Sequence, residues 1–376
     1  MRERDGVGTF DDLHESATRA TGLDDFGGDE YHEGLRVLLA DYEASAGLTG
    51  AGSYMHRSFV RGALVARLLS ESGFHRFPEY VDVEISRPVF VTGLPRTGTT
   101  ALHRLLTADP AHQGPELWLM EYPQPRPPRS AWESDPVFSG IQSAYREHHV
   151  ENPEFMGIHY IDAAEVEECW RLLRQSGTSV GYESVGYLPG YSAWLAGQDW
   201  TGAYRRHKRN LQLIGLNDPH RRWVLKNPSH LVGLDAIMRV YPDALVVQTH
   251  RDPRVAVASA CSLAAEATRG WSTVFEGAVI GRTQLDLWSS AEARFAEQRA
   301  GYDPAQFVDV SYDDFVADPA GTVRSVYAAF DLPWTREVAE RVDVLDGESR
   351  QGPRRPSHRY SLADYGLTGA DVLARF

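Results

Sequence analysis

The residues best suited to chemistry stand close together in one short stretch, residues 88–100. The stretch begins as an apolar strand, passes through a turn rich in Gly, Pro and Thr, and enters a helix whose apolar residues follow a 3.6-residue period. The first N–H groups of a helix have no partner within it, and the positive end of the helix dipole lies at the same point. The stretch therefore predicts a site for an anion.

The spacing within this loop indicates which anion it suits. Gly93 and Gly98 have the spacing of the nucleotide-binding P-loop, G-x-x-x-x-G-K-S/T, but Thr99 occupies the lysine position. A kinase or an ATPase needs that lysine on the β- and γ-phosphates, so its absence argues against ordinary phosphoryl transfer from ATP. A guanidinium, hydroxyls and a glycine backbone suit a compact tetrahedral oxyanion instead. These groups belong to Arg96, Thr97, Gly98, Thr99 and Thr100. Taken alone, the loop is also compatible with a βα turn that binds no ligand.

The run P-R-T-G-T-T at residues 95–100 resembles the 5′-phosphosulfate-binding loop of sulfotransferases that use 3′-phosphoadenosine 5′-phosphosulfate (PAPS). It is most similar to the bacterial branch with P-R-S/T-G-T-T, and the similarity extends from about residue 88 to about residue 367. The resemblance implies sulfuryl transfer from PAPS to a hydroxyl by in-line displacement, with 3′-phosphoadenosine 5′-phosphate (PAP) as product and no metal. It also implies that residues 96–100 hold the 5′-phosphosulfate.

Three residues are candidates for catalysis. Lys226 ends an apolar strand in L-K-N-P-S-H, which resembles the K-x-P-x-H of bacterial sulfotransferases, and the resemblance implies that it neutralises the bridging oxygen as the sulfuryl group leaves. His230 in the same segment is a candidate general base because imidazole titrates near neutrality, with a helix cap or a core histidine as the alternative. Glu116, 20 residues beyond Arg96, lies near where tyrosylprotein sulfotransferases place a catalytic glutamate. Glu121 competes with it, and either carboxylate is otherwise a solvated acid.

A second group of residues resembles the 3′-phosphate site of PAPS enzymes. Arg251 follows a strand, and Ser259 stands eight residues later on the expected helix. An arginine fork and a hydroxyl make an apt clamp for a phosphomonoester. Tyr312 resembles the tyrosine that follows the last core strand and contacts the nucleotide, and Arg354 and Arg355, in a basic loop at 350–367, resemble the segment that closes over the 3′-phosphate.

Strands that alternate with helices surround these residues. Strands at 222–226, 244–250 and 306–311 and helices at 229–241, 253–270, 275–300 and 319–330 predict a parallel sheet covered on both faces, with ligands at its carboxyl edge. With the resemblance, this predicts a three-layer α-β-α, P-loop NTPase-like sulfotransferase fold over residues 88–376.

The segments outside this pattern are expected to be helical. Residues 1–87 form a predicted N-terminal helical extension packed on the core, with helices at 31–47 and 57–72. Residues 1–30 show little periodicity and are expected to include a frayed start. A helical insertion at about 115–215, with helices at 137–149, 163–175 and 200–214, is expected at the acceptor site, and the proline-rich run 123–129 is expected to cross the surface.

Composition limits the partners. The net charge of −14 disfavours nucleic acids and acidic membranes, and no run approaches the ~18 apolar residues of a membrane span. The polar start does not resemble a signal peptide. Cys169 and Cys261 are expected to be buried, reduced thiols. We therefore expect a cytoplasmic protein that is not an integral membrane protein.

Three questions stay open at this level. The acceptor is a small molecule, sugar or lipid with a hydroxyl, and a homo-oligomer is possible. A P-loop kinase or NTPase, or a non-catalytic nucleotide-binding protein of the same fold, are the alternative functions. Thr99 in the lysine position argues against the kinase or NTPase.

Overall fold

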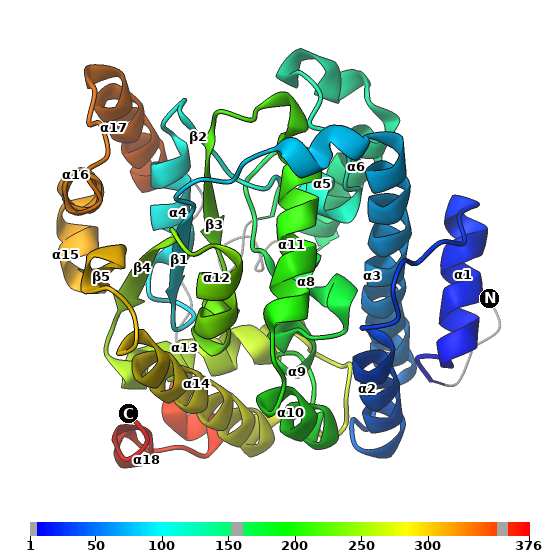
Figure 1. Ribbon diagram of the computed structural model, residues 1–376. Coiled ribbons are helices and arrows are strands. Elements are labelled where there is room, and N and C mark those ends of the chain that lie inside the picture. The colour runs from blue at the N-terminus through cyan, green and yellow to red at the C-terminus, as the bar shows by residue number, and fades with distance from the viewer. Residues whose placement is uncertain (1–5, 152–160, 352–359) are drawn as a thin grey trace.

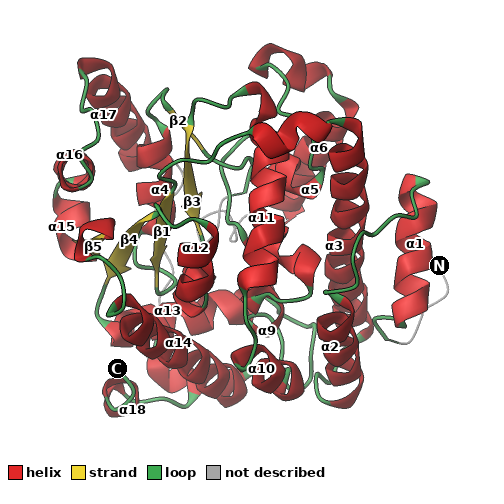
Figure 2. Cartoon of the chain, in the orientation of Figure 1, coloured by secondary structure: helices red, strands yellow, loops and turns green. Residues whose placement is uncertain are grey.

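The computed structural model describes residues 6–151, 161–351 and 360–376, and its centre is a five-stranded parallel sheet enclosed by helices (Figures 1 and 2). The strands lie in the order β2-β3-β1-β4-β5, and every neighbouring pair is parallel. Their bounds are β1 Val89–Gly93, β2 His112–Gln113, β3 Arg222–Lys226, β4 Leu245–His250 and β5 Phe307–Ser311. The predicted α/β fold with a parallel sheet is confirmed.

The two faces of the sheet are covered by different helices. Val89 and Val91 of β1 pack in one apolar cluster with α4 (Thr99–Thr107), α16 (Pro319–Ala329) and α17 (Arg336–Gln351). Phe90, between them, points to the opposite cluster, which contains residues of α11 (Thr201–Ile214), α12 (Leu234–Val240) and α14 (Gly277–Arg299). Successive side chains of a strand alternate between faces, so a strand that is apolar throughout needs a helical layer on each side.

The start of the chain is more ordered than the sequence predicted. Helix α1 (Phe10–Thr21) lies within residues 1–30, where the sequence pattern predicted no helix. The hydroxyl of Thr9 accepts a hydrogen bond from the N–H of Asp12 at 3.2 Å, and Gly22 ends the helix with φ 72°. Leu13 and Ala17, four residues apart, are fully buried. A capped helix with one apolar stripe is stable where it packs, here next to α3 (Gly50–Arg76).

A buried arginine joins the N-terminal helices to the rest of the molecule. The side chain of Arg67 on α3 is fully buried, and it donates hydrogen bonds to the carbonyls of Phe26 at 2.6 Å, Gly28 at 2.7 Å and Gln175 at 3.0 Å. Its guanidinium also pairs with Glu30 at 2.7 Å. Helix α2 (His32–Ala44) packs against α10 (Pro189–Ala196). The division of the chain at residues 87 and 88 stays a prediction.

The expected helix at 163–175 is wrong for most of its length. Only α8 (Trp170–Leu173) and a 3₁₀ turn over Arg174–Ser176 form there. Val166 pairs with Glu116 as an isolated β-bridge, and the N–H of Cys169 donates to the carbonyl of Lys226 at 2.9 Å. These backbone groups are engaged by distant segments, so they cannot also close helical turns.

The proline-rich run is only partly at the surface. It is not helical, as expected, but Arg126 within it is buried and contacts the carboxylates of Glu116 and Asp218, both at 3.0 Å. Helix 229–241 is also shorter than expected, because a 3₁₀ turn over Pro228–Val232 precedes α12. Both cysteines are free and buried, as predicted.

The remaining helices complete the two layers and their edges. Within the described ranges, no helix is long and apolar enough to cross a membrane. The helices not yet given bounds are α5 Leu117–Glu121, α6 Pro136–Glu151, α9 Val180–Glu183, α13 Pro253–Ala267, α15 Tyr312–Ala317 and α18 Gly369–Leu373.

The last residue of β1 is a test of this packing. Gly93 has φ 139°, and a Cβ atom there would lie 2.4 Å from the backbone oxygen of Thr249 on β4. We expect Gly93→Ala to lower the free energy of unfolding by about 1–3 kcal/mol, measured by urea denaturation. Gly140→Ala is the control: Gly140 lies within α6 with no atom near its missing Cβ, so alanine should be neutral or stabilising by up to about 1 kcal/mol. Equal effects of the two substitutions would contradict the packing argument.

Candidate active site

The loop between β1 and α4 leads into the N-terminus of a helix at one edge of the sheet. Gly98 is the N-cap residue of α4, with φ 89°, and as a glycine it has no side chain to cap the first turn. The N–H groups at the start of α4 are therefore left for an acceptor from outside the helix. The hydroxyl of Thr97 donates to the carbonyl of Leu94 at 2.6 Å and lies 2.6 Å from the hydroxyl of Thr249. In this state Thr97 holds the shape of the loop.

Lys226 lies beside the start of α4. It is the last residue of β3 and is paired in register with Val91 of β1. Its Nζ atom donates a hydrogen bond to the hydroxyl of Thr100 at 3.0 Å, and its side chain is only 1% exposed. A buried ammonium at this position adds a full positive charge to the partial charge of the helix N-terminus.

Glu168 is the functional candidate that sequence reasoning missed. Its carboxylate forms an ion pair and hydrogen bond with Lys226, 58 residues away along the chain. Its position follows from the backbone, because the next residue, Cys169, donates to the carbonyl of Lys226. The segment had been assigned to a helix, where an isolated glutamate is an ordinary solvated acid. No spacing in the sequence connects Glu168 with Lys226.

A pair of arginines lies on the other side of the loop. Arg96 donates from Nε to the hydroxyl of Ser259 on α13 at 3.3 Å. Arg251, which directly follows β4, donates to the carbonyl of Arg96 at 2.9 Å, and its guanidinium stacks 3.9 Å over the ring of Tyr312. Burial lowers the pKa of Arg96, the nearby charge of Arg251 lowers it further, and Tyr360 and Tyr312 oppose this effect. Arginine nonetheless stays charged at neutral pH, so the group is cationic.

The strand order explains why these residues meet. Gly93, Lys226, His250 and Ser311 are the last residues of β1, β3, β4 and β5, and the four strands are parallel. The connection after β1 leads to β2 and β3 on one side, whereas β4 and β5 lie on the other. The loop after β1 and the arginine after β4 therefore share the crevice where the winding direction of the sheet changes, which is where α/β sheets bind ligands.

The structure does not bring His230 into hydrogen-bond contact with the loop. The residue is fully buried, its Nδ1 atom is 2.7 Å from the hydroxyl of Tyr204, and its ring meets Phe90 edge to face at 5.0 Å. Its Nε2 atom has no hydrogen-bond partner within the described ranges. Burial lowers the pKa of His230 well below its ordinary value, and Lys226 and His207 contribute to the same shift. A neutral core histidine fits this environment, and its role as general base stays a prediction.

The two other carboxylates considered from the sequence are held by arginines. Glu116 accepts from Arg126 at 3.0 Å, on the side of the sheet where β2 lies. Glu121 binds both Arg171 and Arg174, which lower the pKa of its carboxyl although burial opposes them. The catalytic role of Glu116 stays a prediction, and these contacts do not connect it with Lys226.

Three half-buried aromatic rings form a group that includes Trp170, two residues after Glu168 in the chain. Phe59 of α3 contacts the ring of Trp170 with a centroid distance of 6.3 Å and that of Trp271 at 5.8 Å. His56 lies one turn before Phe59, and its ring centroid is 5.6 Å from that of Trp271. Burial lowers the pKa of His56 to about 4, so this histidine is neutral at pH 7. The side chains of the aromatic cluster, defined as His56, Phe59, Trp170 and Trp271, carry no charge themselves. The guanidinium groups of Arg171 and Arg174 lie over the ring of Trp170, at 4.9 Å and 5.3 Å from its centroid.

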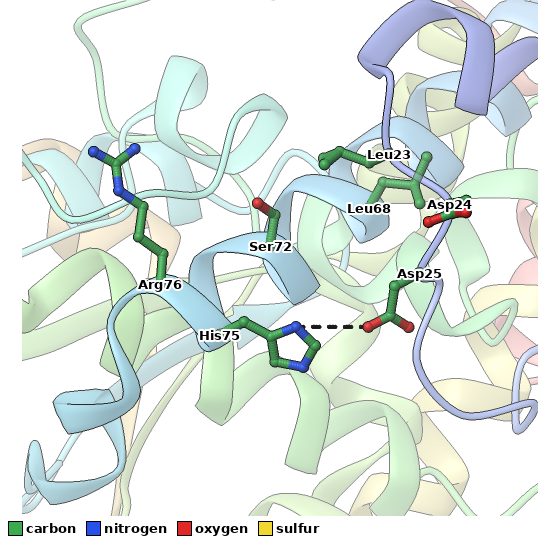
Figure 3. Close-up of a pocket in the computed structure, with 7 residues that line it drawn as sticks. All are labelled: Leu23, Asp24, Asp25, Leu68, Ser72, His75 and Arg76. Atoms are coloured by element: carbon green, nitrogen blue, oxygen red, sulfur yellow. Dashed lines mark ion pairs between the residues drawn. The ribbon is translucent and has the colours of Figure 1, made fainter.

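Other candidate features do not belong to this site. Arg354 and Arg355 lie outside the described residues. A surface hollow at the end of α3 is lined by residues that belong neither to the loop nor to the strand ends, and within it His75 and Asp25 are 3.7 Å apart and both exposed (Figure 3). In the described part of the chain, no group of three or more His, Cys, Asp and Glu residues could hold a metal ion.

Comparison with known proteins gives concordant matches. A family model described as "Sulfotransferase family" matches residues 88–336. The crystal structure of sulfotransferase STF1 from Mycobacterium tuberculosis H37Rv is 56% identical, covers 99% of both chains and has a TM-score of 0.93. That of sulfotransferase STF9 from Mycobacterium avium is 27% identical, covers 99% of this chain and 96% of its own, and has a TM-score of 0.89.

A curated relative matches over a shorter region. The omega-hydroxy-beta-dihydromenaquinone-9 sulfotransferase Stf3 of Mycobacterium bovis is 25% identical over 250 residues. The match covers 64% of this chain and 61% of the length of that relative.

The buried histidines predict how stability depends on pH. Burial lowers the pKa of His103 and of His207 to about 3, against about 6.5 in an unfolded chain. The unfolded state therefore binds more protons below pH 6.5, and stability falls as the pH drops from 6.5 towards 3. At pH 5 each of these histidines should lower the free energy of unfolding by up to about 2 kcal/mol, relative to neutral pH.

Urea unfolding of wild type and His207→Gln at pH 5, 6 and 7.5 checks this. We expect the variant to lose less stability between pH 7.5 and pH 5 than the wild type does. His220→Gln, at an exposed position, is the control and should leave the pH dependence unchanged. An identical slope for wild type and His207→Gln would contradict the assignment of His207 as a buried neutral group.

Proposed function

The chain belongs to the sulfotransferase family, and from this membership we propose that it transfers the sulfuryl group of PAPS to the hydroxyl of a small-molecule acceptor. PAPS supplies an activated sulfuryl group on its 5′-phosphate and carries a second anionic group, the 3′-phosphate. The observation that carries the proposal is the convergence of two cationic groups on one sheet edge, Lys226 with the start of α4 on one side and Arg251 with Arg96 on the other.

The chemistry of these residues fits the two anionic ends of the nucleotide. The unpaired N–H groups of α4, the hydroxyl of Thr100 and Lys226 would hold the 5′-phosphosulfate. Arg251 and Ser259 would hold the 3′-phosphate, and Tyr312 lies against Arg251 where it can contact the nucleotide. Charge-assisted hydrogen bonds from buried donors are the strong ones, and they fix orientation as well as charge.

Catalysis in this arrangement depends on position and electrostatics. Lys226 is held by β3 and buried, so it does not need to reorganise when negative charge develops on the oxygen that leaves sulfur. The loop fixes the sulfuryl group for attack in line with the departing oxygen.

The aromatic cluster supports an acceptor with an apolar body. Trp170 lies two residues after Glu168, and Phe59 places α3 of the N-terminal region against it. Aromatic surface favours an apolar molecule over a sugar, which needs several hydrogen-bond partners. The two arginines over Trp170 are already paired with Glu121. The relative named above is called a sulfotransferase of omega-hydroxy-beta-dihydromenaquinone-9, an alcohol of this kind.

Binding of the desulfated nucleotide tests the donor assignment. We expect PAP to bind the wild type in isothermal titration and Arg251→Ala to weaken binding about 10- to 150-fold, the value of one lost charge-assisted contact of about 1.5–3 kcal/mol. Arg254→Ala is the matched control, because Arg254 pairs with Asp252 on the surface and should be removable without loss of affinity. Absence of PAP binding to the wild type, or tighter binding of ATP with magnesium, would reject the donor.

Acceptor choice tests the role of the aromatic cluster. We expect the wild type to transfer radiolabelled sulfate from PAPS to geraniol, an apolar alcohol, in preference to glucose. Phe59→Ala should raise the KM for geraniol about tenfold or more, since a buried phenyl group contributes about 1.5–3 kcal/mol, and should leave PAP affinity unchanged. Phe10→Ala, at a half-buried phenylalanine of α1, is the control. Preference for glucose would contradict the apolar acceptor but not the donor.

A further inference from the structure

We propose that Trp271 limits the length of the apolar acceptor that the protein sulfates; the inference rests on the proposed function. Trp271 belongs to the aromatic cluster, which is assembled from three segments far apart in the sequence: α3, α8 and the connection between α13 and α14. Helix α3 precedes residues 88–336, which the family model matches. Part of this aromatic surface therefore comes from outside the matched region.

The cluster begins beside Lys226. Trp170 directly follows Cys169, whose N–H donates to the carbonyl of Lys226 at 2.9 Å. The ring centroid of Phe59 lies 6.3 Å from that of Trp170 and 5.8 Å from that of Trp271, so Phe59 joins the two tryptophans. All three side chains are half-buried and thus partly open to solvent. An acceptor whose hydroxyl reaches the sulfuryl group near Lys226 would lay its apolar body along these rings, from Trp170 towards Trp271.

The accessible part of the cluster ends at Trp271. The ring centroid of His56 lies 5.6 Å from that of Trp271, and that of Tyr42 lies 4.6 Å from that of His56. His56 is 1% exposed and Tyr42 is 5% exposed, so neither offers surface to a ligand. Trp271 is therefore the last ring of this series that an acceptor can contact, and its indole stands between the acceptor and the buried pair.

The backbone holds Trp271 in place against α3. Leu48, in the connection between α2 and α3, forms an antiparallel bridge with Ser272. The N–H of Thr49 donates to the carbonyl of Trp271 at 2.9 Å. A Cβ atom at Gly52, in the first turn of α3, would lie 1.8 Å from the same carbonyl oxygen, so the two segments approach as closely as a glycine allows. A side chain can set a size limit only where its backbone is fixed in this way.

A role in packing alone would have different consequences. If Trp271 only covered apolar surface, its removal would lower stability and affect all acceptors alike. If its indole ends the acceptor site, its removal lengthens the apolar surface, and acceptors that were too long gain contacts. Acceptor length is therefore the variable that separates the two roles.

The experiment compares wild type and Trp271→Ala with geraniol, farnesol and geranylgeraniol. These prenyl alcohols differ in length but carry the same terminal hydroxyl. We expect the variant to raise the ratio of kcat/KM for geranylgeraniol to kcat/KM for geraniol about tenfold or more, because selectivity for a single methylene in an apolar site is about 10- to 200-fold. PAP affinity in isothermal titration should stay unchanged, because Trp271 is not among the residues proposed to hold the nucleotide.

Two further variants separate specificity from stability. Trp271→Phe keeps a smaller ring and should shift the ratio in the same direction but less, and it decides the question if Trp271→Ala does not fold. Trp334→Ala is the matched control: Trp334 is also half-buried, but its ring packs at 5.1 Å on Tyr327 of α16, within the other apolar cluster. It should leave the length preference unchanged. Thermal unfolding verifies that each variant is folded.

The possible failures are distinguishable. An equal loss for all three alcohols, or a change in the ratio smaller than about threefold in the folded variants, would overturn the role of Trp271 while leaving sulfuryl transfer intact. A shift of the same size in Trp334→Ala would do the same. A wild type that binds PAP but sulfates none of the three alcohols would reject the apolar acceptor and this inference with it, while the donor assignment would stand.

Discussion

The backbone of the loop between β1 and α4 is the constraint on which the rest of the site depends. Gly93, Arg96 and Gly98 all have positive φ angles, of 139°, 71° and 89°. A Cβ atom at Gly98 would lie 3.2 Å from the ring of Phe315 and 3.3 Å from that of Tyr312, so the loop packs closely on the segment after β5. At Arg96, a left-handed conformation costs about 1–2 kcal/mol because the residue has a side chain.

The segment after β4, which includes the start of α13, stabilises this strained residue. Arg251 donates to the carbonyl of Arg96, and Ser259 accepts from its Nε atom. The residues proposed to contact the 3′-phosphate therefore also hold the loop that is proposed to bind the 5′-phosphosulfate. The two halves of the site share residues, so nucleotide binding at one end is expected to order the other.

Several of these features follow from the sequence and others do not. The parallel sheet, the turn between Gly93 and Gly98 and the place of Arg251 at the end of a strand were predictable, because each depends on local pattern. The hydrogen bond from Arg251 to Arg96 was not predicted. Glu168 was not predictable, since its contact with Lys226 depends on the bridge between Val166 and Glu116, which prevents a helix. The bridge joins segments 50 residues apart, and no local propensity reports it. By contrast, the N-cap of α1 at Thr9 is a local sequence signal, and this helix was predictable from it.

The pairing of Lys226 with Glu168 stabilises a buried charge at the end of β3. A lysine that is 1% exposed needs a counter-ion, because removing one partner of a buried pair costs about 3–5 kcal/mol. Glu168 fills this need. In the proposed transfer, the phosphosulfate end of the nucleotide would compete with this carboxylate for the ammonium of Lys226.

In the proposed transfer, the nucleotide would bring a second counter-ion to Lys226. Negative charge that develops on the departing oxygen would then face an ammonium that β3 already holds in place. The carboxylate of Glu116 stands apart from this pair, because its counter-ion is Arg126.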